Sequence, residues 1–286
     1  MTSGRAAQKK IEERQRGWRA KAGGADNLFQ QLSAAFLRGF RGGSGNELAG
    51  KIRSANSSAA LVVNVFQSLL ESRHAHKLVT RVFDLPSTAG SLEFAVEAQF
   101  YTGAGGNPAN LDLLINSAGL SLAIESKFIE PYRGLSYKDS DGKREFRPAY
   151  FSQPKRAIWK QLPSCLEEAQ RIDLARRNQA PRYLRFDAPQ LLKHLVGLER
   201  NLPASGTPNR CDSYRLVNLW YDAGSPEATE YREEASMFAE AIKPDLIPGR
   251  REFRLLAYQE LFSRIEMLPP FERAEEYLCY LRARYF

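Results

Sequence analysis

The most constraining feature of this chain is residues 111–128, LDLLINSAGLSLAIESKF, where two apolar runs flank a Ser-Ala-Gly turn. Short apolar runs on either side of a glycine-containing turn predict a β-hairpin. Charged residues interrupt these runs, with Asp112 in the first and Glu125 and Lys127 near the end of the second. Strand residues two apart project to the same side, so Glu125 and Lys127 share a face, roughly 7 Å apart. Correct pairing of the hairpin would bring Asp112 and Glu125 together at one point.

Other segments show the periodicities of helices and strands in mixed order. The segment NSSAALVVNVFQSLL is apolar almost throughout, which predicts a buried central helix. Asp187 precedes Ala-Pro and is expected to cap a helix. Strands are expected at 77–83, 91–101, 110–117, 120–128, 215–223 and 252–258. Helices are expected at 27–40, 47–72, 153–177 with a break at Pro163, 188–202, 225–242, 259–268 and 271–286.

The net charge of the chain indicates which kind of partner it could bind, and its cysteines indicate the redox state of its compartment. Lys and Arg outnumber Asp and Glu by 41 to 33, and the pI is near 9.4. This basic excess is compatible with a polyanionic partner. The three cysteines lie far apart without a C-x-x-C pair, which argues against a disulfide framework or a thiolate zinc site and fits a reducing cytoplasm. No run approaches the roughly eighteen apolar residues of a membrane span, so no membrane association is expected.

The expected organisation is a basic N-terminal arm with one helix over residues 1–45, followed by a single domain over 46–286. The core of that domain would cover about 46–222, and a strand–helix extension would occupy 223–286. The basic arm is the first candidate for tracking along DNA, the alternative being a solubilising tail. A weaker nucleic-acid-binding candidate is the group of cations at Lys155, Arg156 and Lys160.

Two carboxylates that meet at one point repel each other and need a cation. Oxygen ligands without His or Cys suit Mg²⁺ or Mn²⁺ rather than zinc. A lysine two residues beyond the ligand could orient a water molecule, lower its pKa or neutralise charge on a phosphate. The chemistry that this set suits best is hydrolysis of a phosphodiester. On spacing alone, Glu125 and Lys127 could equally form an exposed ion pair on a half-wet sheet.

The arrangement resembles the PD-(D/E)XK nuclease superfamily, in which an Asp on one strand precedes a (Asp/Glu)-x-Lys on the next. Asn110-Leu111-Asp112 stands where that family has Pro-Asp, and Glu125-Ser126-Lys127 matches the second half. Pro108 is close to Asp112 but not adjacent, which departs from the pattern. The resemblance covers roughly residues 46–222. It implies an α/β fold with a restriction-endonuclease-like mixed central sheet (αβββαβ core) flanked by helices, with helical N- and C-terminal additions.

The resemblance also assigns roles. It implies Mg²⁺ (or Mn²⁺) held by Asp112, Glu125 and the carbonyl of Ser126, with Lys127 at the nucleophilic water. An upstream Glu adds a metal ligand in many members, and Glu97 is the first choice here. Glu93 and Glu47 are the alternatives to Glu97. Gln190 and the four residues after it resemble the Gln-x-x-x-Tyr motif of some members, so Gln190 is a further catalytic candidate; without that motif, His194 would be an ordinary helix-face residue.

These implications lead to an expected function. The chain is expected to be a metal-dependent endonuclease that hydrolyses DNA, of a bacterial restriction or defence type, with RNA left open as a substrate. A homodimer is expected by analogy, because cutting two strands needs two sites. One alternative is a catalytically silent nucleic-acid-binding or interaction protein on the same fold. Another is an enzyme that acts on small phosphorylated molecules.

Overall fold

The fold is known from a computed structural model of the chain. It describes residues 6–14, 27–43, 48, 50–54, 56–86, 92–104, 108–117, 119–135, 146, 148–152, 157–201 and 211–286. Glu47 and the cations Lys155 and Arg156 lie outside the described residues, and the expected helix 47–72 is a short 3-10 helix at Lys51–Arg53 followed by an α-helix from Ser58.

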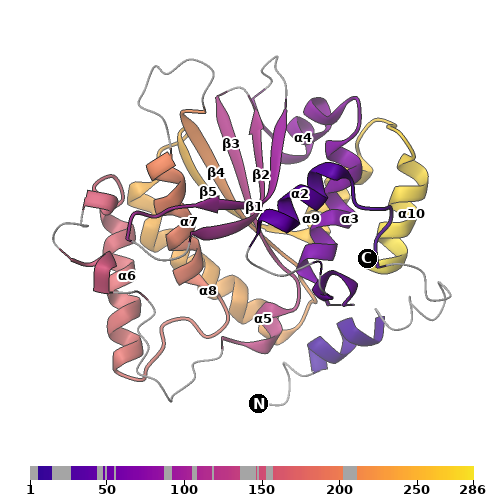
Figure 1. Ribbon diagram of the computed structural model, residues 1–286. Coiled ribbons are helices and arrows are strands. Elements are labelled where there is room, and N and C mark those ends of the chain that lie inside the picture. Colours follow the sequence, from indigo (N-terminus) through magenta and orange to yellow (C-terminus); the bar gives the residue numbers. More distant parts are fainter. Residues whose placement is uncertain are drawn as a thin grey trace.

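Helices surround a five-stranded sheet (Figure 1). The strands are β1 Glu93–Phe100, β2 Ala109–Ser117, β3 Leu120–Lys127, β4 Ser213–Trp220 and β5 Arg251–Ala257. The longer helices are α2 Ala34–Gly42, α3 Ser58–Leu70, α4 Ala75–Phe83, α6 Pro163–Arg177, α7 Ala188–Asn201, α8 Pro226–Ile242, α9 Tyr258–Glu266 and α10 Ala274–Arg284. A single helical turn, α5 Glu130–Arg133, follows β3 directly.

The sheet is mixed, with strand order β1-β2-β3-β4-β5. The first three strands form an antiparallel meander, while β4 pairs parallel to β3 and β5 parallel to β4. The two parallel strands enter after helices, as parallel connections require. The predicted α/β class with a helix-flanked mixed sheet is therefore confirmed, including the hairpin from Ala109 to Lys127.

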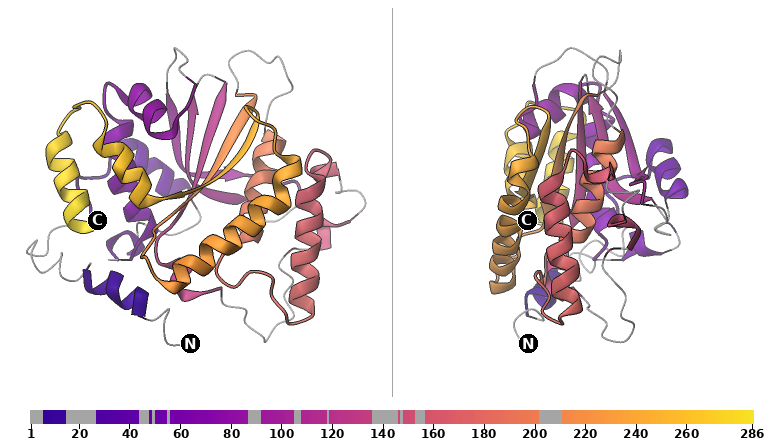
Figure 2. Two further views of the ribbon diagram at one scale, coloured as in Figure 1. Left: turned by 180° about the vertical axis from the view of Figure 1, so that it is seen from behind. Right: turned by 90° about the vertical axis from the view of Figure 1, so that its left-hand side faces the viewer.

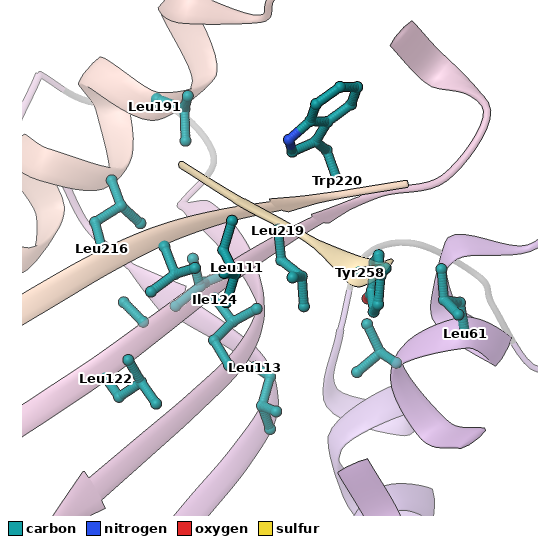
Figure 3. Close-up of a cluster of buried hydrophobic side chains, with 14 of the residues drawn as sticks. Leu61, Leu111, Leu113, Leu122, Ile124, Leu191, Leu216, Leu219, Trp220 and Tyr258 are labelled. Atoms are coloured by element: carbon teal, nitrogen blue, oxygen red, sulfur yellow. The ribbon is translucent and has the colours of Figure 1, made fainter. Parts of the chain in front are cut away.

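Both faces of the sheet are covered, and α6 lies on the opposite side of the molecule from α10 and the C-terminus (Figure 2). The hairpin residues Leu113 and Ile124 are fully buried. Figure 3 shows the apolar cluster around them, with Leu191 of α7 above the β4 ribbon and Leu61 of α3 on the other side. The helix α3 is buried along nearly its whole length, as its composition predicts.

The strand predicted at residues 77–83 is wrong, because these residues belong to the helix α4. Its buried side chains are Leu78, Val79, Val82 and Phe83. They form two pairs four residues apart, which is helical spacing. The β-branched residues suggested a strand, but the spacing of the apolar residues decides the structure.

Most other predicted elements are confirmed with shifted ends. Pro163 begins α6 as its first residue, where its missing N–H costs nothing, rather than interrupting a longer helix. The N-cap role of Asp187 is confirmed, since its Oδ1 accepts the amide of Gln190 at 3.1 Å. The helix α2 begins only at Ala34, where Ser33 caps it. Residues 27–33 before it are not helical.

The segments on either side of the expected core also contact it. Phe36 of α2 packs against Phe94 of β1, and β5 extends the central sheet at its other end. Residues 6–14 form a helix in which Ala7 and Ile11 are buried. The domain boundaries expected near residues 45 and 222 stay a prediction. Among the helices that the structure describes, none has the length and apolarity to span a bilayer.

Gly197 lets α7 approach the sheet closely. A Cβ at this position would lie 2.8 Å from the Cβ of Phe100 on β1. We expect Gly197→Ala to lower the free energy of unfolding by about 1–3 kcal/mol, because the helix would have to shift. The matched control is Gly42→Ala on α2, where an added Cβ meets nothing within 4 Å. Urea unfolding of both variants measures the effect, and equal midpoints would contradict this role of Gly197.

Candidate functional site

The hairpin register brings Asp112 and Glu125 together. The pairing of β2 with β3 ends at Leu113 and Ile124, and Asp112 and Glu125 are the next residue on each strand, close enough for the charge of Glu125 to act on Asp112. Antiparallel residues in register project to the same side of the sheet. The predicted convergence of Asp112 and Glu125 therefore holds in the structure.

Asp112 is half-buried, and its Oδ2 accepts the backbone amide of Ser126 at 2.6 Å. Within the described part of the chain, Oδ1 of Asp112 has no hydrogen-bond partner. Burial and then the negative charge of Glu125 raise the pKa of Asp112 well above its usual value. A carboxyl group in this position is unfavourable when ionised unless a cation is nearby.

Glu125 is buried and its carboxylate contacts cationic or polar groups on both oxygens. Oε1 lies 2.8 Å from Nζ of Lys127, and Oε2 lies 3.0 Å from Nε2 of His194. Burial alone would raise the pKa of Glu125, but Lys127 and then His194 outweigh it and lower the pKa to about 2. Conversely, burial would lower the pKa of Lys127, but Glu125 raises it above its ordinary value. Both groups are therefore ionised at neutral pH.

The helix α7 supplies two contacts to this pair. Oε1 of Gln190 accepts from Nζ of Lys127 at 2.6 Å, so the structure brings this predicted residue into the cluster. The contact of His194 with Glu125 was missed, since sequence reasoning assigned His194 no role of its own and made it an ordinary helix-face residue if the Gln-x-x-x-Tyr motif does not apply. The available signal was its position four residues after Gln190, on the same helix face.

Glu97 lies on β1 beside Asp112, but not as strict strand alternation predicts. Its φ is 52°, in the left-handed region that costs a non-glycine residue about 1–3 kcal/mol. Before it, Val96 packs near Gly39 of α2, whereas Phe100 after it faces α7 at Gly197. Val96 and Phe100 would share one face of a regular strand, yet they contact different helices, so the direction in which the side chains of β1 point changes at Glu97. The side chain of Glu97 itself lies against the end of α2.

The role of Glu97 as a metal ligand stays a prediction. Its charge raises the pKa of Asp112, but less than burial and Glu125 do. Of the alternatives, Glu93 is exposed at the start of β1, and Glu47 lies outside the described residues.

Ser126 lies between Glu125 and Lys127 in the sequence, and its side chain projects to the opposite side of β3 from theirs. Its hydroxyl contacts the hydroxyl of Tyr258 at 2.7 Å, from the side of the sheet that α9 covers. Its backbone amide meanwhile binds Asp112. Ser126 is thereby fixed at both ends, which would hold its carbonyl, the predicted third oxygen ligand, in a constant orientation.

The donor set suits a hard divalent cation, although it is small. Asp112, whose carboxyl group has a raised pKa, contributes an oxygen that makes no hydrogen bond within the described residues. Each oxygen of Glu125 bonds to Lys127 or His194 and keeps a second lone pair. Such oxygen donors fit Mg²⁺ or Mn²⁺. Within the described residues, no group of three His, Cys, Asp or Glu side chains could hold a metal ion. A metal here would need backbone oxygen and water as its remaining ligands.

A groove of about 400 Å³ lies beyond the end of β1 and includes Lys160 in its lining. Arg200 also lines this groove, and its guanidinium lies over Gly103. Neither cation makes an ion pair within the described part of the chain. Phe100 at the end of β1 pairs with Ala109, three residues before Asp112, or about 10 Å along the strand. The groove is therefore at the same end of the sheet as the carboxylates.

Comparison with known families gives one match. Residues 11–286 match the family model described as "Restriction Endonuclease associating with ARP". This agrees with the restriction-endonuclease-like fold that the hairpin motif predicts and the mixed sheet shows. No curated protein and no solved structure matches the chain.

Proposed function

This chain belongs to the family "Restriction Endonuclease associating with ARP", and from that membership we propose that it is a metal-dependent endonuclease that hydrolyses phosphodiester bonds in DNA. The observation that carries the proposal is the contiguous cluster of Asp112, Glu125 and Lys127 at the open end of the hairpin. These three residues match the spacing of the nuclease motif, with Asp112 on β2, and Glu125 and Lys127 in contact with each other on the adjacent strand β3. The family description supports the proposal of a restriction or defence role.

Asp112 and Glu125 are the proposed ligands of Mg²⁺ or Mn²⁺, together with the carbonyl of Ser126. The metal would polarise the scissile phosphate and lower the pKa of a water molecule. The raised pKa of Asp112 supports this assignment, because a neighbouring cation would relieve the cost of its ionised form.

Lys127 is proposed to contact the phosphate or the attacking water as a hydrogen-bond donor. Its ammonium has three N–H donors, of which Glu125 and Gln190 engage two. The third is available to an oxygen of the substrate. Because the pKa of Lys127 is raised, the group stays protonated and acts through its charge rather than by accepting a proton.

The groove beside β1 is the proposed path of the nucleic-acid backbone. Lys160 and Arg200 are exposed cations without ion-pair partners in the described residues, and their groove lies at the same end of the sheet as the carboxylates. Glu199 also lines the groove, but its carboxylate lies 3.0 Å from Arg251 and is thereby neutralised. The groove therefore presents a net positive charge to a substrate.

The double variant Lys160→Gln/Arg200→Gln removes both groove cations. We expect it to bind DNA more weakly and with an affinity that depends less steeply on salt concentration. Each lost phosphate contact lowers the slope of log K against log salt by about 1, so the double variant should lose about 2. The matched control is Lys77→Gln/Arg81→Gln on α4, which removes the same charge. This helix lies at the other end of the sheet, where His76 contacts Ser117. Anisotropy titrations at several salt concentrations make the comparison, and equal slopes for both variants would contradict the assigned path.

The proposed function is tested by incubating the protein with plasmid and linear DNA in Mg²⁺, Mn²⁺ or a chelator. We expect the wild type to cleave DNA in the presence of metal and to lose cleavage in chelator. We expect Glu125→Gln to lose cleavage even with metal. RNA substrates in the same assay decide the sugar specificity, and sedimentation of the protein with and without DNA tests the expected homodimer. Absence of metal-dependent cleavage on every substrate would contradict the proposal.

One observation favours the alternative of a nucleic-acid-binding protein that does not cleave. Both oxygens of Glu125 have protein partners, so its charge is neutralised by the protein itself. A silent protein would bind DNA without any metal requirement and would keep that binding in Asp112→Asn. Metal-dependent cleavage would exclude this alternative.

A further inference from the structure

Two side chains of the helix α7 are spaced along its axis as two charged residues are spaced along β3. Gln190 and His194 are four residues apart, which corresponds to a rise of about 6 Å along a helix. Glu125 and Lys127 are two residues apart, or about 6.6 Å along a strand. Each member of one pair therefore meets one member of the other, with Gln190 on Lys127 and His194 on Glu125.

His194 makes its contact from a fully enclosed position. Its exposed fraction is 1%, and the neighbouring helix residues Leu191 and Leu195 are buried as well. Nδ1 of the ring is buried and has no hydrogen-bond partner. Glu125 is the one group within the described residues that bonds to this imidazole. An apolar side chain would fill the same space without an unpaired nitrogen, so packing alone does not account for a histidine here.

The contact also restricts the orientation of the carboxylate. Lys127 bonds to Oε1 and His194 to Oε2, so the carboxylate of Glu125 is held at both ends. Each oxygen keeps a second lone pair that a cation could use. Hydrogen bonds to a ligating carboxylate orient it, and their loss typically costs 10- to 100-fold in metal affinity.

We propose that His194 is a positioning residue of the nuclease centre, which holds Glu125 through Oε2 in the orientation that binds the divalent cation. This inference rests on the proposed function. It assigns His194 no contact with the substrate and no part in proton transfer. Its effect is exerted through Glu125 alone.

Calorimetric titration of Mn²⁺ into the metal-free protein tests the inference. His194→Leu keeps an apolar side chain of similar size but removes the donor, and we expect its Mn²⁺ affinity to fall about 10- to 100-fold. His194→Gln places an amide N–H near the same point and should retain affinity within a few-fold of the wild type. The control is His76→Leu, since His76 contacts Ser117 at the other end of the sheet. Its affinity should equal that of the wild type.

Cleavage assays provide a second readout. Raising the Mn²⁺ concentration should restore cleavage by His194→Leu, because the defect is in metal affinity rather than in folding. If His194→Leu does not fold, His194→Asn replaces it, since the asparagine amide is too short to reach Glu125 and should lose affinity where His194→Gln keeps it.

Two results would overturn the inference. Wild-type Mn²⁺ affinity in the variant without the donor would show that the contact does not position Glu125. Equal losses in His194→Gln and His194→Leu would show that only the packing of the imidazole matters. A wild-type protein that neither binds Mn²⁺ nor cleaves DNA would instead contradict the proposed function, and the inference would fall with it.

Discussion

Lys127→Met is expected to lower the rate of metal-dependent DNA cleavage about 100- to 1,000-fold, the typical cost of removing a group that stabilises charge in the transition state. The variant should still bind Mn²⁺, because Asp112 and Glu125 remain. The measurement is single-turnover cleavage of a labelled duplex at saturating metal. Lys77→Met on α4 is the matched control, since Lys77 is an exposed lysine at the other end of the sheet.

Stability is measured beside activity for Lys127→Met. The substitution removes one partner of a buried pair, which typically costs about 3–5 kcal/mol. His194 still contacts Glu125, so we expect a smaller loss and a folded protein. A folded Lys127→Met protein that cleaves at the wild-type rate would remove Lys127 from the catalytic group.

Asp112→Asn is expected to have opposite effects on function and on stability. Cleavage and metal binding should be lost, because the variant lacks a charged ligand. The metal-free protein should become more stable, by about 1 kcal/mol for this half-buried group, or about 2–4 °C in Tm. The physical reason is that burial and Glu125 oppose ionisation of Asp112 in the folded state.

The gain in stability should depend on pH. The folded-state pKa of Asp112 is raised, so its ionised form destabilises the fold as pH rises above the unfolded value of about 3.9 and through the folded pKa. The difference in Tm between Asp112→Asn and the wild type should therefore be near zero in acid and grow toward neutral pH. Thermal unfolding across that range in a chelator measures it. A metal-free variant less stable than the wild type at neutral pH would contradict the burial of an unfavourable charge.

The sequence predicted the hairpin and the meeting of Asp112 with Glu125 because both depend on local pattern. Two apolar runs and a turn define the antiparallel pair, and a period of two then determines which residues share a face. Neither step needs knowledge of distant segments. The same local reasoning predicted the N-cap at Asp187 and the buried helix α3.

The contacts made by α7 could not be derived in this way. His194 meets Glu125 across 69 residues of sequence, and the meeting depends on how closely α7 packs on the sheet. Gly197 permits that approach, but a glycine within a helix indicates only reduced helix propensity until its neighbour Phe100 is known. On spacing alone the charged face of β3 could have been half-wet, whereas α7 contacts it through Gln190 and His194.

Glu97 illustrates a second limit of sequence reasoning. The pattern of alternating residues in β1 predicts its side chain on the face of Glu93, and a single left-handed φ changes that alternation. A glutamate gives no local signal of such a conformation, which is common only for glycine. The side chain of Glu97 lies against Gly43 at the end of α2, a contact that is visible only in the fold.

The central claim is that Asp112 and Glu125 form a divalent-metal centre, and a calorimetric titration of Mn²⁺ at neutral pH tests it most directly. The wild-type protein is predicted to bind Mn²⁺ at a site that is lost in Asp112→Asn and in Glu125→Gln, while both variants remain folded. Absence of binding by the wild type, or unchanged binding by both variants, would contradict the assignment of this centre.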